Sequence, residues 1–256
     1  MSGPSAGRWV VGGTLGAAIA ALAYSRRTLT LDGAVAAAVV GSATFTLGGL
    51  PAAGALLAFF GTSSGLSRVG ESRKLVLPLA QAKGSRRDAW QVLANGGVAT
   101  LCVVAGRPRG LLGALAAAAA DTWATELGLL SKASPRLITT LRRVPAGTSG
   151  GVTLHGLGAS VGGALVVGVA YAALGGGWSS LPRALGGGLG GALVDSLLGA
   201  TLQAAYWCPR CDLPTEDALH KRCGAPTELR AGLIWMTNDT VNGLATLAGA
   251  AIALLY

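Results

Sequence analysis

Residues 110–130 read GLLGALAAAAADTWATELGLL, and this stretch decides the class of fold. It is long enough to cross the roughly 30 Å hydrocarbon core of a bilayer as one helix, and its only charged side chains are Asp121 and Glu126. The whole chain has the same character, because 51% of its 256 residues are hydrophobic and 12% are charged, about half the roughly 25% charged residues of soluble domains. This composition excludes a soluble domain and a disordered chain, and it predicts an all-α integral membrane helix bundle.

Similar apolar stretches predict about eight transmembrane helices in a single integral membrane domain, residues 1–256. The expected spans are 9–24, 33–47, 50–66, 90–106, 110–130, 156–176, 183–206 and 232–255. The division between the second and third spans rests on Gly48, Gly49 and Pro51, which mark either a tight turn or a kink in one long helix. Seven spans are therefore the alternative.

The net charge of +9 is mostly a matter of topology. With eight spans, 16 of the 20 Lys and Arg residues fall on one side of the membrane, and merging residues 33–66 into one helix changes the division to 15 against 5. Because basic loops stay in the cytoplasm, we expect the basic side to be cytoplasmic and both termini to lie outside the cell membrane. No nucleic-acid partner is expected, and the oligomeric state is left open.

Charged and amide side chains inside the spans are costly, so each is a candidate for function. Asp121 and Glu126 are five residues apart, about 140° around a regular helix, and so do not share a face. Asp195 continues a stripe of glycines at every fourth residue, which lets another group come close to it. The remaining candidates are Asn95, Asn238, Asp239 and Asn242. These groups could form one polar site that binds Mg²⁺ or phosphate, or the amides could make interhelical hydrogen bonds.

A glycine-rich segment precedes the sixth span. Residues 145–156 read PAGTSGGVTLHG, and such glycines and hydroxyls directly before a helix suit a phosphate. The candidate phosphate-binding residues are Gly147, Thr148, Ser149, Gly150, Gly151 and Thr153. The segment is not a Walker A motif, and a flexible connector is the alternative interpretation. Lys83, Arg86 and Arg87 supply cations at the start of the fourth span, or they anchor that loop on the cytoplasmic side.

Three of the four cysteines lie in the loop 207–231, between the last two spans. Cys208, Cys211, His220 and Cys223 have the spacing C-x2-C-x8-H-x2-C, which is typical of a small tetrahedral zinc site. A cytoplasmic position disfavours a disulfide. We therefore expect structural Zn²⁺ in a zinc-knuckle-like loop.

Five stretches together resemble one known family. They are RDAWQVLANG (87–96), ADTWATELG (120–128), SPRLITT (134–140), VPAGTSGGVT (144–153) and VDSLLGATLQ (194–203). Over roughly residues 30–255 the chain resembles the transmembrane-protein-19 family, which includes the plant and cyanobacterial phytyl-phosphate kinases. Asp121, Ala124 and Gly128 also fit the Asp-x-x-Ala-x-x-x-Gly stretch of two CTP-dependent membrane enzymes, dolichol kinase and phosphatidate cytidylyltransferase.

The resemblance implies a membrane phosphotransferase that phosphorylates an isoprenyl (phytyl-type) monophosphate from a CTP-like nucleoside triphosphate. On this hypothesis Asp121, Glu126 and Asp195 hold Mg²⁺, and the loop 147–153 cradles phosphates. The charge of the transferring group is neutralised by Lys83, Arg86 and Arg87, and the catalytic residues include Arg87 and Asn95. The nucleotide site extends to Asn238, Asp239 and Asn242.

Two other functions are compatible with the same residues. A cytidylyltransferase that forms a CDP-lipid would use the same nucleotide site and break a different phosphate bond. A small membrane transporter would also keep acids and amides at mid-membrane. The implied partners of the kinase are the lipid bilayer, a nucleoside triphosphate and an isoprenyl monophosphate.

Overall fold

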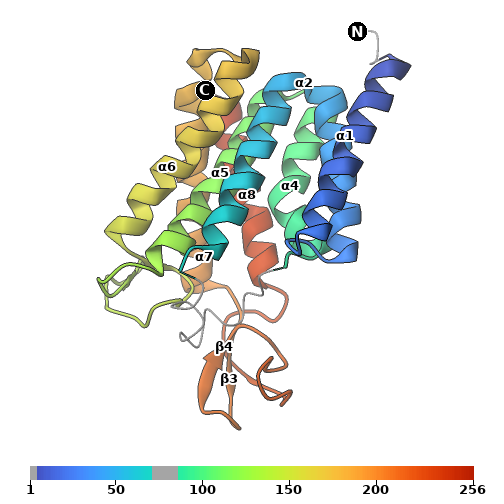
Figure 1. Ribbon diagram of the computed structural model, residues 1–256. Coiled ribbons are helices and arrows are strands. Elements are labelled where there is room, and N and C mark those ends of the chain that lie inside the picture. The colour runs from blue at the N-terminus through green and yellow to red at the C-terminus, as the bar shows by residue number, and fades with distance from the viewer. Residues whose placement is uncertain (1–4, 71–85) are drawn as a thin grey trace.

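The computed structural model describes residues 5–70 and 86–256 and shows a bundle of long helices with two small sheets at one end (Figure 1). The long helices are α1 (Ala6–Ser25), α2 (Leu31–Arg68), α4 (Ala89–Val104), α5 (Pro108–Gly128), α6 (Leu154–Tyr171), α7 (Leu181–Thr201) and α8 (Asn238–Leu255). Two short helices, η2 (Ala172–Gly176) and η3 (Trp178–Ser180), join α6 to α7. The predicted all-α helix bundle is confirmed.

Helix α2 is a hairpin of two antiparallel arms, 31–48 and 50–68. Gly49 between them has φ +66° and ψ −162°, which is not a helical conformation. A straight helix of this length would be about 57 Å long, yet Arg68 at its end donates a hydrogen bond of 3.1 Å to the carbonyl of Arg26, which precedes its start. Figure 1 shows the chain turning over at the top of α2. The glycines and Pro51 thus form a tight turn, as the first of the two interpretations predicts.

Sequence signals explain where several helices begin. Asp88 caps α4 in a capping box, in which its carboxylate accepts from the Gln91 N–H at 3.0 Å and the Gln91 side chain accepts from the Asp88 N–H. Pro108 starts α5, where its missing N–H is harmless. Thr153 and Thr237 cap α6 and α8 through their side-chain oxygens. These caps fix the helix ends that surround the site described below.

Helix α5 runs through the centre of the bundle. Every residue in 110–120 is buried, and α5 packs against α4, α6, α7 and α8. Three glycines make the close packing possible: a Cβ on Gly249 of α8 would lie 2.7 Å from the Gly113 carbonyl oxygen and 2.8 Å from that of Gly187. Helices α5, α7 and α8 therefore meet at backbone distance, which only glycine allows.

Hydropathy separates the outer helices from the central ones. By length and composition, three helical stretches within the described ranges are apolar enough to cross a membrane: α1, α2 and Leu154–Gly176. Helix α4 is apolar but shorter. Helices α5 and α7 are rich in Ala and Gly, which lowers their hydropathy, and α5 is covered by its neighbours. The number of membrane crossings therefore stays a prediction, although the two arms of α2 have the alternating directions that eight spans require.

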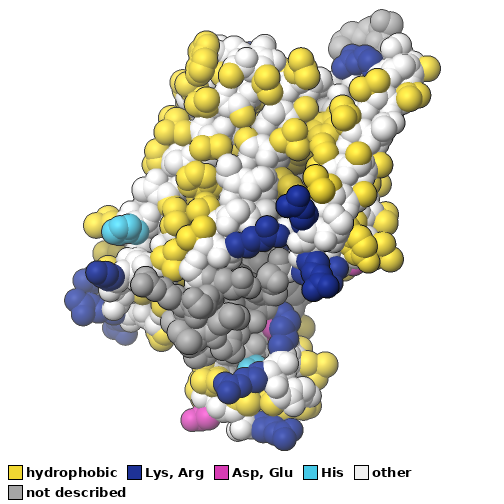
Figure 2. All heavy atoms as spheres, viewed as in Figure 1, with side chains coloured by type: hydrophobic (Ala, Val, Ile, Leu, Met, Phe, Trp, Pro, Cys, Tyr) yellow, Lys and Arg dark blue, Asp and Glu magenta, His cyan; other side chains and the backbone are white. Residues whose placement is uncertain are grey.

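Basic side chains gather at one end of the bundle, here called the basic end. Figure 2 shows most of the visible Lys and Arg residues at and below the lower ends of the helices, under a body of hydrophobic and small neutral side chains. Both small sheets lie there: β1 (Arg136–Leu137) pairs antiparallel with β2 (Gly151–Val152), and β3 (Ala205–Cys208) lies between β4 (Leu213–Thr215) and β5 (Glu228–Ala231). The two basic loops that carry these sheets thus lie at the same end of the helices.

Candidate functional site

A cavity of about 360 Å³ opens at the basic end between α5, α6 and α7. Its polar lining includes Asp121 and Thr125 of α5 and Asp195 and Ser196 of α7. Asn238, the first residue of α8, also lines it. The structure therefore brings together two of the predicted membrane acids, one predicted amide and the whole loop 147–153.

The cavity exists because α6 and α7 are close at one end and apart at the other. A Cβ on Gly168 of α6 would lie 2.8 Å from the Ala184 side chain of α7, and a Cβ on Gly188 of α7 would lie 2.5 Å from that of Ala164. Toward the basic end α6 leans away from α7 (Figure 1). Helix α5 forms the floor of the resulting crevice, with Ala124 and Gly128 among its lining residues.

The cavity also has an apolar lining, which reaches the outer surface of the bundle. Leu157 and Val161 of α6 and Leu189 and Leu193 of α7 line it. Leu157, Val161 and Leu193 are also 39%, 37% and 44% exposed, so the edge of the cavity lies on the surface that hydrocarbon would cover. One cavity is thus lined both by two carboxylates and by apolar side chains that reach the surface.

The glycine-rich loop is held in a defined conformation. Gly147 and Gly150 have φ +89° and +75°, which favour glycine. The Thr148 N–H donates to the Pro145 carbonyl at 3.2 Å, and the Gly151 N–H donates to the Thr148 carbonyl at 2.9 Å. Two of the amides expected to be free for phosphate are therefore used inside the loop. A Cβ on Gly150 would lie 2.5 Å from the Ala200 nitrogen, so the loop packs directly on the end of α7.

Glu126 lies away from this cavity. It accepts a hydrogen bond of 2.6 Å from the Ser67 hydroxyl at the end of α2, and it does not line the cavity that contains Asp121. The two acids occupy different faces of α5, as their five-residue spacing predicts. Burial lowers the pKa of Arg87, and the negative charge of Glu126 opposes that shift. Glu126 and Arg87 are thus electrostatic neighbours.

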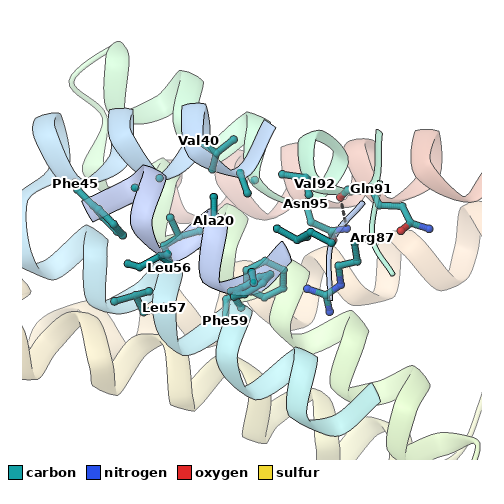
Figure 3. Close-up of a pocket in the computed structure, with 18 residues that line it drawn as sticks. Ala20, Val40, Phe45, Leu56, Leu57, Phe59, Arg87, Gln91, Val92 and Asn95 are labelled. Atoms are coloured by element: carbon teal, nitrogen blue, oxygen red, sulfur yellow. Dashed lines mark hydrogen bonds between the residues drawn. The ribbon is translucent and has the colours of Figure 1, made fainter. Parts of the chain in front are cut away.

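Arg87 and Asn95 line a second, apolar pocket of about 60 Å³ between α1, α2 and α4 (Figure 3). The Arg87 guanidinium lies 5.9 and 5.7 Å from the ring centres of Phe59 and Phe60. Figure 3 shows Arg87, Gln91 and Asn95 together at one end and apolar side chains along the rest. This volume is far below the roughly 300–1,000 Å³ of typical ligand pockets, so the pocket is too small for a nucleotide.

The other predicted cations and amides are dispersed. The Arg86 guanidinium donates to the Leu29 carbonyl at 2.9 Å and faces the Tyr24 ring. Asp239 and Asn242 of α8 are not among the residues that line the first cavity. Lys83 lies outside the described residues. Of the residues predicted to form one polar site, those that line this cavity are Asp121, Asp195, Asn238 and the loop 147–153.

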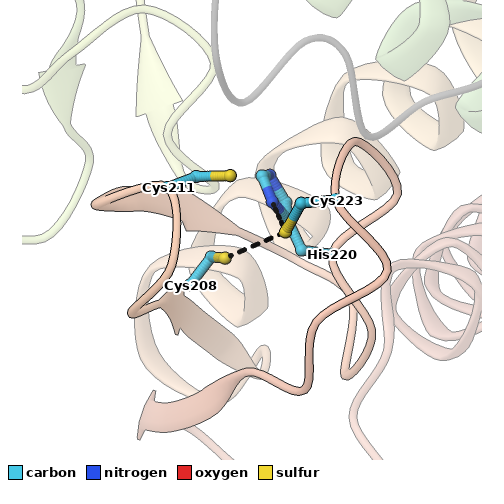
Figure 4. Close-up of side chains that lie close together, drawn as sticks. All are labelled: Cys208, Cys211, His220 and Cys223. Carbon is cyan, nitrogen blue, oxygen red and sulfur yellow. Dashed lines mark hydrogen bonds between the residues drawn. The ribbon is translucent and has the colours of Figure 1, made fainter.

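A second candidate centre is the predicted cysteine–histidine cluster (Figure 4). One ligand atom from each of Cys208, Cys211, His220 and Cys223 lies within 4.8 Å of all the others, so the cluster could hold a metal ion. The Sγ atoms of Cys208 and Cys223 are 3.6 Å apart, and His220 Nδ1 is 3.2 Å from Cys223 Sγ. Zinc–sulfur bonds of about 2.3 Å in a tetrahedron place two sulfurs about 3.8 Å apart, close to the observed separation.

The electrostatics of the cluster favour a thiolate. Hydrogen bonds from the Ala225 backbone and then from His220 lower the pKa of Cys223 to about 6. Contact with Cys223 is the main cause that raises the pKa of Cys211 to about 11. A thiolate is the form of cysteine that binds metals, so the cluster is chemically suited to a cation.

Sequence reasoning missed the connection between the two centres. Ser149 of the glycine-rich loop donates a short hydrogen bond to the Glu216 carboxylate, and the Gln203 amide donates to both Ser149 Oγ and Glu216 Oε1 at 3.0 Å. Glu216 lies between Cys211 and His220 in the chain. Gln203 ends one of the quoted motifs, but the pairing of residues 67 positions apart has no local signal.

Taken together, the helices, the cavity and the cysteine–histidine cluster define a polytopic membrane protein with a polar site at one membrane surface. The chain belongs to the family described as integral membrane protein DUF92, whose model matches residues 14–250. The family resemblance expected from the motifs is thereby confirmed, and the protein is an integral membrane protein.

Three relatives illustrate the breadth of the family. The chain is 36% identical over 186 residues to Protein PGR of Arabidopsis thaliana, which covers 60% of this chain and 65% of that protein. It is 36% identical over 154 residues to an uncharacterized membrane protein of Methanocaldococcus jannaschii, covering 58% and 63%. A Synechocystis membrane protein is 29% identical over 216 residues, covering 78% and 71%. The matches thus span less than two thirds of the first two relatives, and no solved structure matches the chain.

Proposed function

We propose that the protein is a membrane phosphotransferase that transfers the terminal phosphoryl group of a CTP-like nucleoside triphosphate to an isoprenyl monophosphate. The observation that carries this proposal is the composition of the cavity between α5, α6 and α7. It combines two carboxylates and a glycine-rich loop with an apolar crevice at the protein surface. A lipid phosphate has the matching parts, a doubly charged head and an apolar chain.

The oxygen-bearing side chains that line the cavity suit a magnesium ion. Asp121 and Asp195 offer carboxylate oxygens, and Asn238, Thr125 and Ser196 offer neutral oxygens. Hard cations such as Mg²⁺ take oxygen ligands and keep part of their water when they bind phosphates. When bound, Mg²⁺ would neutralise charge on the triphosphate. We therefore assign Asp121 and Asp195 as its ligands. Glu126 is not assigned as a ligand, because it accepts a hydrogen bond from Ser67, interacts with Arg87 and does not line this cavity.

The glycine-rich loop would orient the phosphates. An oxygen of the isoprenyl monophosphate attacks the γ-phosphorus, the bond from that phosphorus to the β–γ bridging oxygen breaks, and the products are the isoprenyl diphosphate and a nucleoside diphosphate. The acceptor is largely ionised near neutral pH, so no strong base is needed. The loop 147–153 lies at the N-terminus of α6, whose partial positive charge stabilises phosphate oxygens. The chain of the acceptor would occupy the crevice along Leu157, Val161 and Leu193.

The cysteine–histidine cluster has a structural part in this proposal. Its donor set and spacing suit Zn²⁺, which would stabilise a segment too short to build a core of its own. The basic end would face the cytoplasm, where nucleoside triphosphates are found.

Product analysis with two labels tests the reaction type. Purified protein in lipid nanodiscs receives phytyl monophosphate and CTP labelled either at the α or at the γ phosphate. Label from the γ position in a lipid diphosphate is the expected result. Label from the α position would instead establish a cytidylyltransferase. Flux of a solute in proteoliposomes without nucleotide, and no labelled lipid from either substrate, would establish a transporter.

A further inference from the structure

The cysteine–histidine segment contacts the glycine-rich loop through an acidic residue, Glu216. Its carboxylate accepts hydrogen bonds from Ser149 of the loop and from Gln203, just after α7. Gln203 is 6% exposed, and both Ser149 and Gln203 line the cavity. Hydrogen bonds to a charged partner in a partly buried setting are among the stronger ones in proteins.

Two contacts hold the glycine-rich loop, one with α7 and one with Glu216. On one side, a Cβ on Gly199 of α7 would lie 2.9 Å from the Gly150 nitrogen, so the loop backbone rests on the helix end. On the other side, Glu216 holds the Ser149 hydroxyl. Glu216 therefore holds one side chain at the middle of the loop.

Glu216 lies within the segment that carries the cysteine–histidine cluster. Glu216 directly follows β4, a strand of three residues, and precedes His220 by four positions. The sheet β4–β3–β5 has strands of three, four and four residues. Cys208, the last residue of β3, is buried, and His220 is buried in the connection between β4 and β5, so two members of the cluster lie in the small interior of this segment. Segments of this size need a metal or a disulfide to stay folded.

We propose that metal binding at the cluster orders the glycine-rich loop of the cavity, with Glu216 as the positioning residue that connects them. On this proposal, the metal-bound segment 205–231 keeps the loop 147–153 ordered through the hydrogen bond of Glu216 to Ser149. The inference concerns the order of the loop, and it rests on the proposed function only for the statement that the loop binds phosphate.

Hydrogen–deuterium exchange of the full-length protein in nanodiscs tests this connection. Exchange of the amides in residues 144–153 and in residues 205–231 is measured with bound metal, after metal removal by a chelator, and in Glu216→Gln. The matched control is Glu228→Gln, because Glu228 is exposed on β5 and pairs only with Arg230 among its described salt-bridge partners. Metal content is measured for every sample.

Glu216→Gln should speed exchange in residues 144–153 about tenfold, while its metal content and the exchange of residues 205–231 stay near wild type. Metal removal should speed exchange in both segments, and Glu228→Gln should change neither. The proposal is overturned if metal removal loosens residues 205–231 alone, if Glu216→Gln leaves residues 144–153 unchanged, or if the purified protein contains no metal.

Enzyme assays separate this inference from the proposed function. If transfer activity is present, Glu216→Gln should raise the KM for the nucleotide more than it lowers kcat, since Glu216 does not line the cavity. If wild-type protein transfers no phosphate, the proposed function fails. The exchange experiment still decides whether metal binding at the cluster orders the loop 147–153.

Discussion

Adding one methyl group where α5, α7 and α8 meet should destabilise the bundle. A Cβ on Gly249 would lie 2.6 Å from the Ala117 Cβ, 2.7 Å from the Gly113 carbonyl oxygen and 2.8 Å from the Gly187 carbonyl oxygen. Two of these atoms are backbone on different helices, so the strain is relieved only by moving α8 away. Overpacking of this kind costs about 2 kcal/mol, within the range of about 1–3. For a chain of this size, that corresponds to a fall in Tm of about 4–8 °C.

The matched control lies on the same helix. Gly243 of α8 has no heavy atom within 4 Å of an added Cβ. Gly243→Ala should therefore raise stability by up to about 1 kcal/mol, because alanine is the better helix former. Thermal unfolding of both variants and of wild type in one detergent, followed by tryptophan fluorescence, shows whether each variant raises or lowers Tm. A Gly249→Ala protein as stable as Gly243→Ala would refute the three-helix contact.

Two further changes test the separate centres at the basic end. Cys223→Ser should remove the bound metal measured in the purified protein, whereas Cys102→Ser, which changes a cysteine of α4, should leave it in place; equal metal content in the two variants would contradict a metal site at the cluster. Gly150→Ala should weaken nucleotide binding about tenfold or more, because the alanine would be strained at φ +75° and would press on Ala200. Gly158→Ala on α6, where an added Cβ meets nothing within 4 Å, should bind nucleotide normally, and similar affinities for the two variants would show that the loop conformation is irrelevant.

Local patterns predicted much of the fold. The Gly-Gly-x-Pro sequence at residues 48–51 predicted either a tight turn or a kink, and the structure has the turn, at Gly49. The five-residue spacing of Asp121 and Glu126 predicted different faces of α5, and only Asp121 lines the cavity. The stripe of glycines around Asp195 predicted a close approach, and Gly187 packs on α5 and α8 while Gly199 packs on the loop at Gly150. Periodicity and spacing are local properties, so they could be read from the chain.

Contacts between distant segments could not be predicted in the same way. The sequence places Arg87 and Asn95 near the basic end, but nothing in it says that they line a pocket between α1, α2 and α4 rather than the α6–α7 crevice. The three-residue network of Glu216, Ser149 and Gln203 depends on how a loop of residues 205–231 folds back, which no periodic pattern encodes. The apolar lining of the cavity exists because α6 and α7 diverge. This divergence is a property of how the two helices pack on α5, so the sequence does not show it.

The most direct test of the proposed function is the transfer of γ-phosphate from CTP to phytyl monophosphate by three variants in nanodiscs. Asp121→Asn and Asp195→Asn should each lower turnover by about a hundredfold or more, because each removes a charge that balances the magnesium ion at the triphosphate. Glu228→Gln, an acid on exposed β5, should keep wild-type turnover. All three proteins should keep the wild-type Tm to within a few degrees. Wild-type turnover in Asp121→Asn would contradict the assignment of the cavity as the site of phosphoryl transfer.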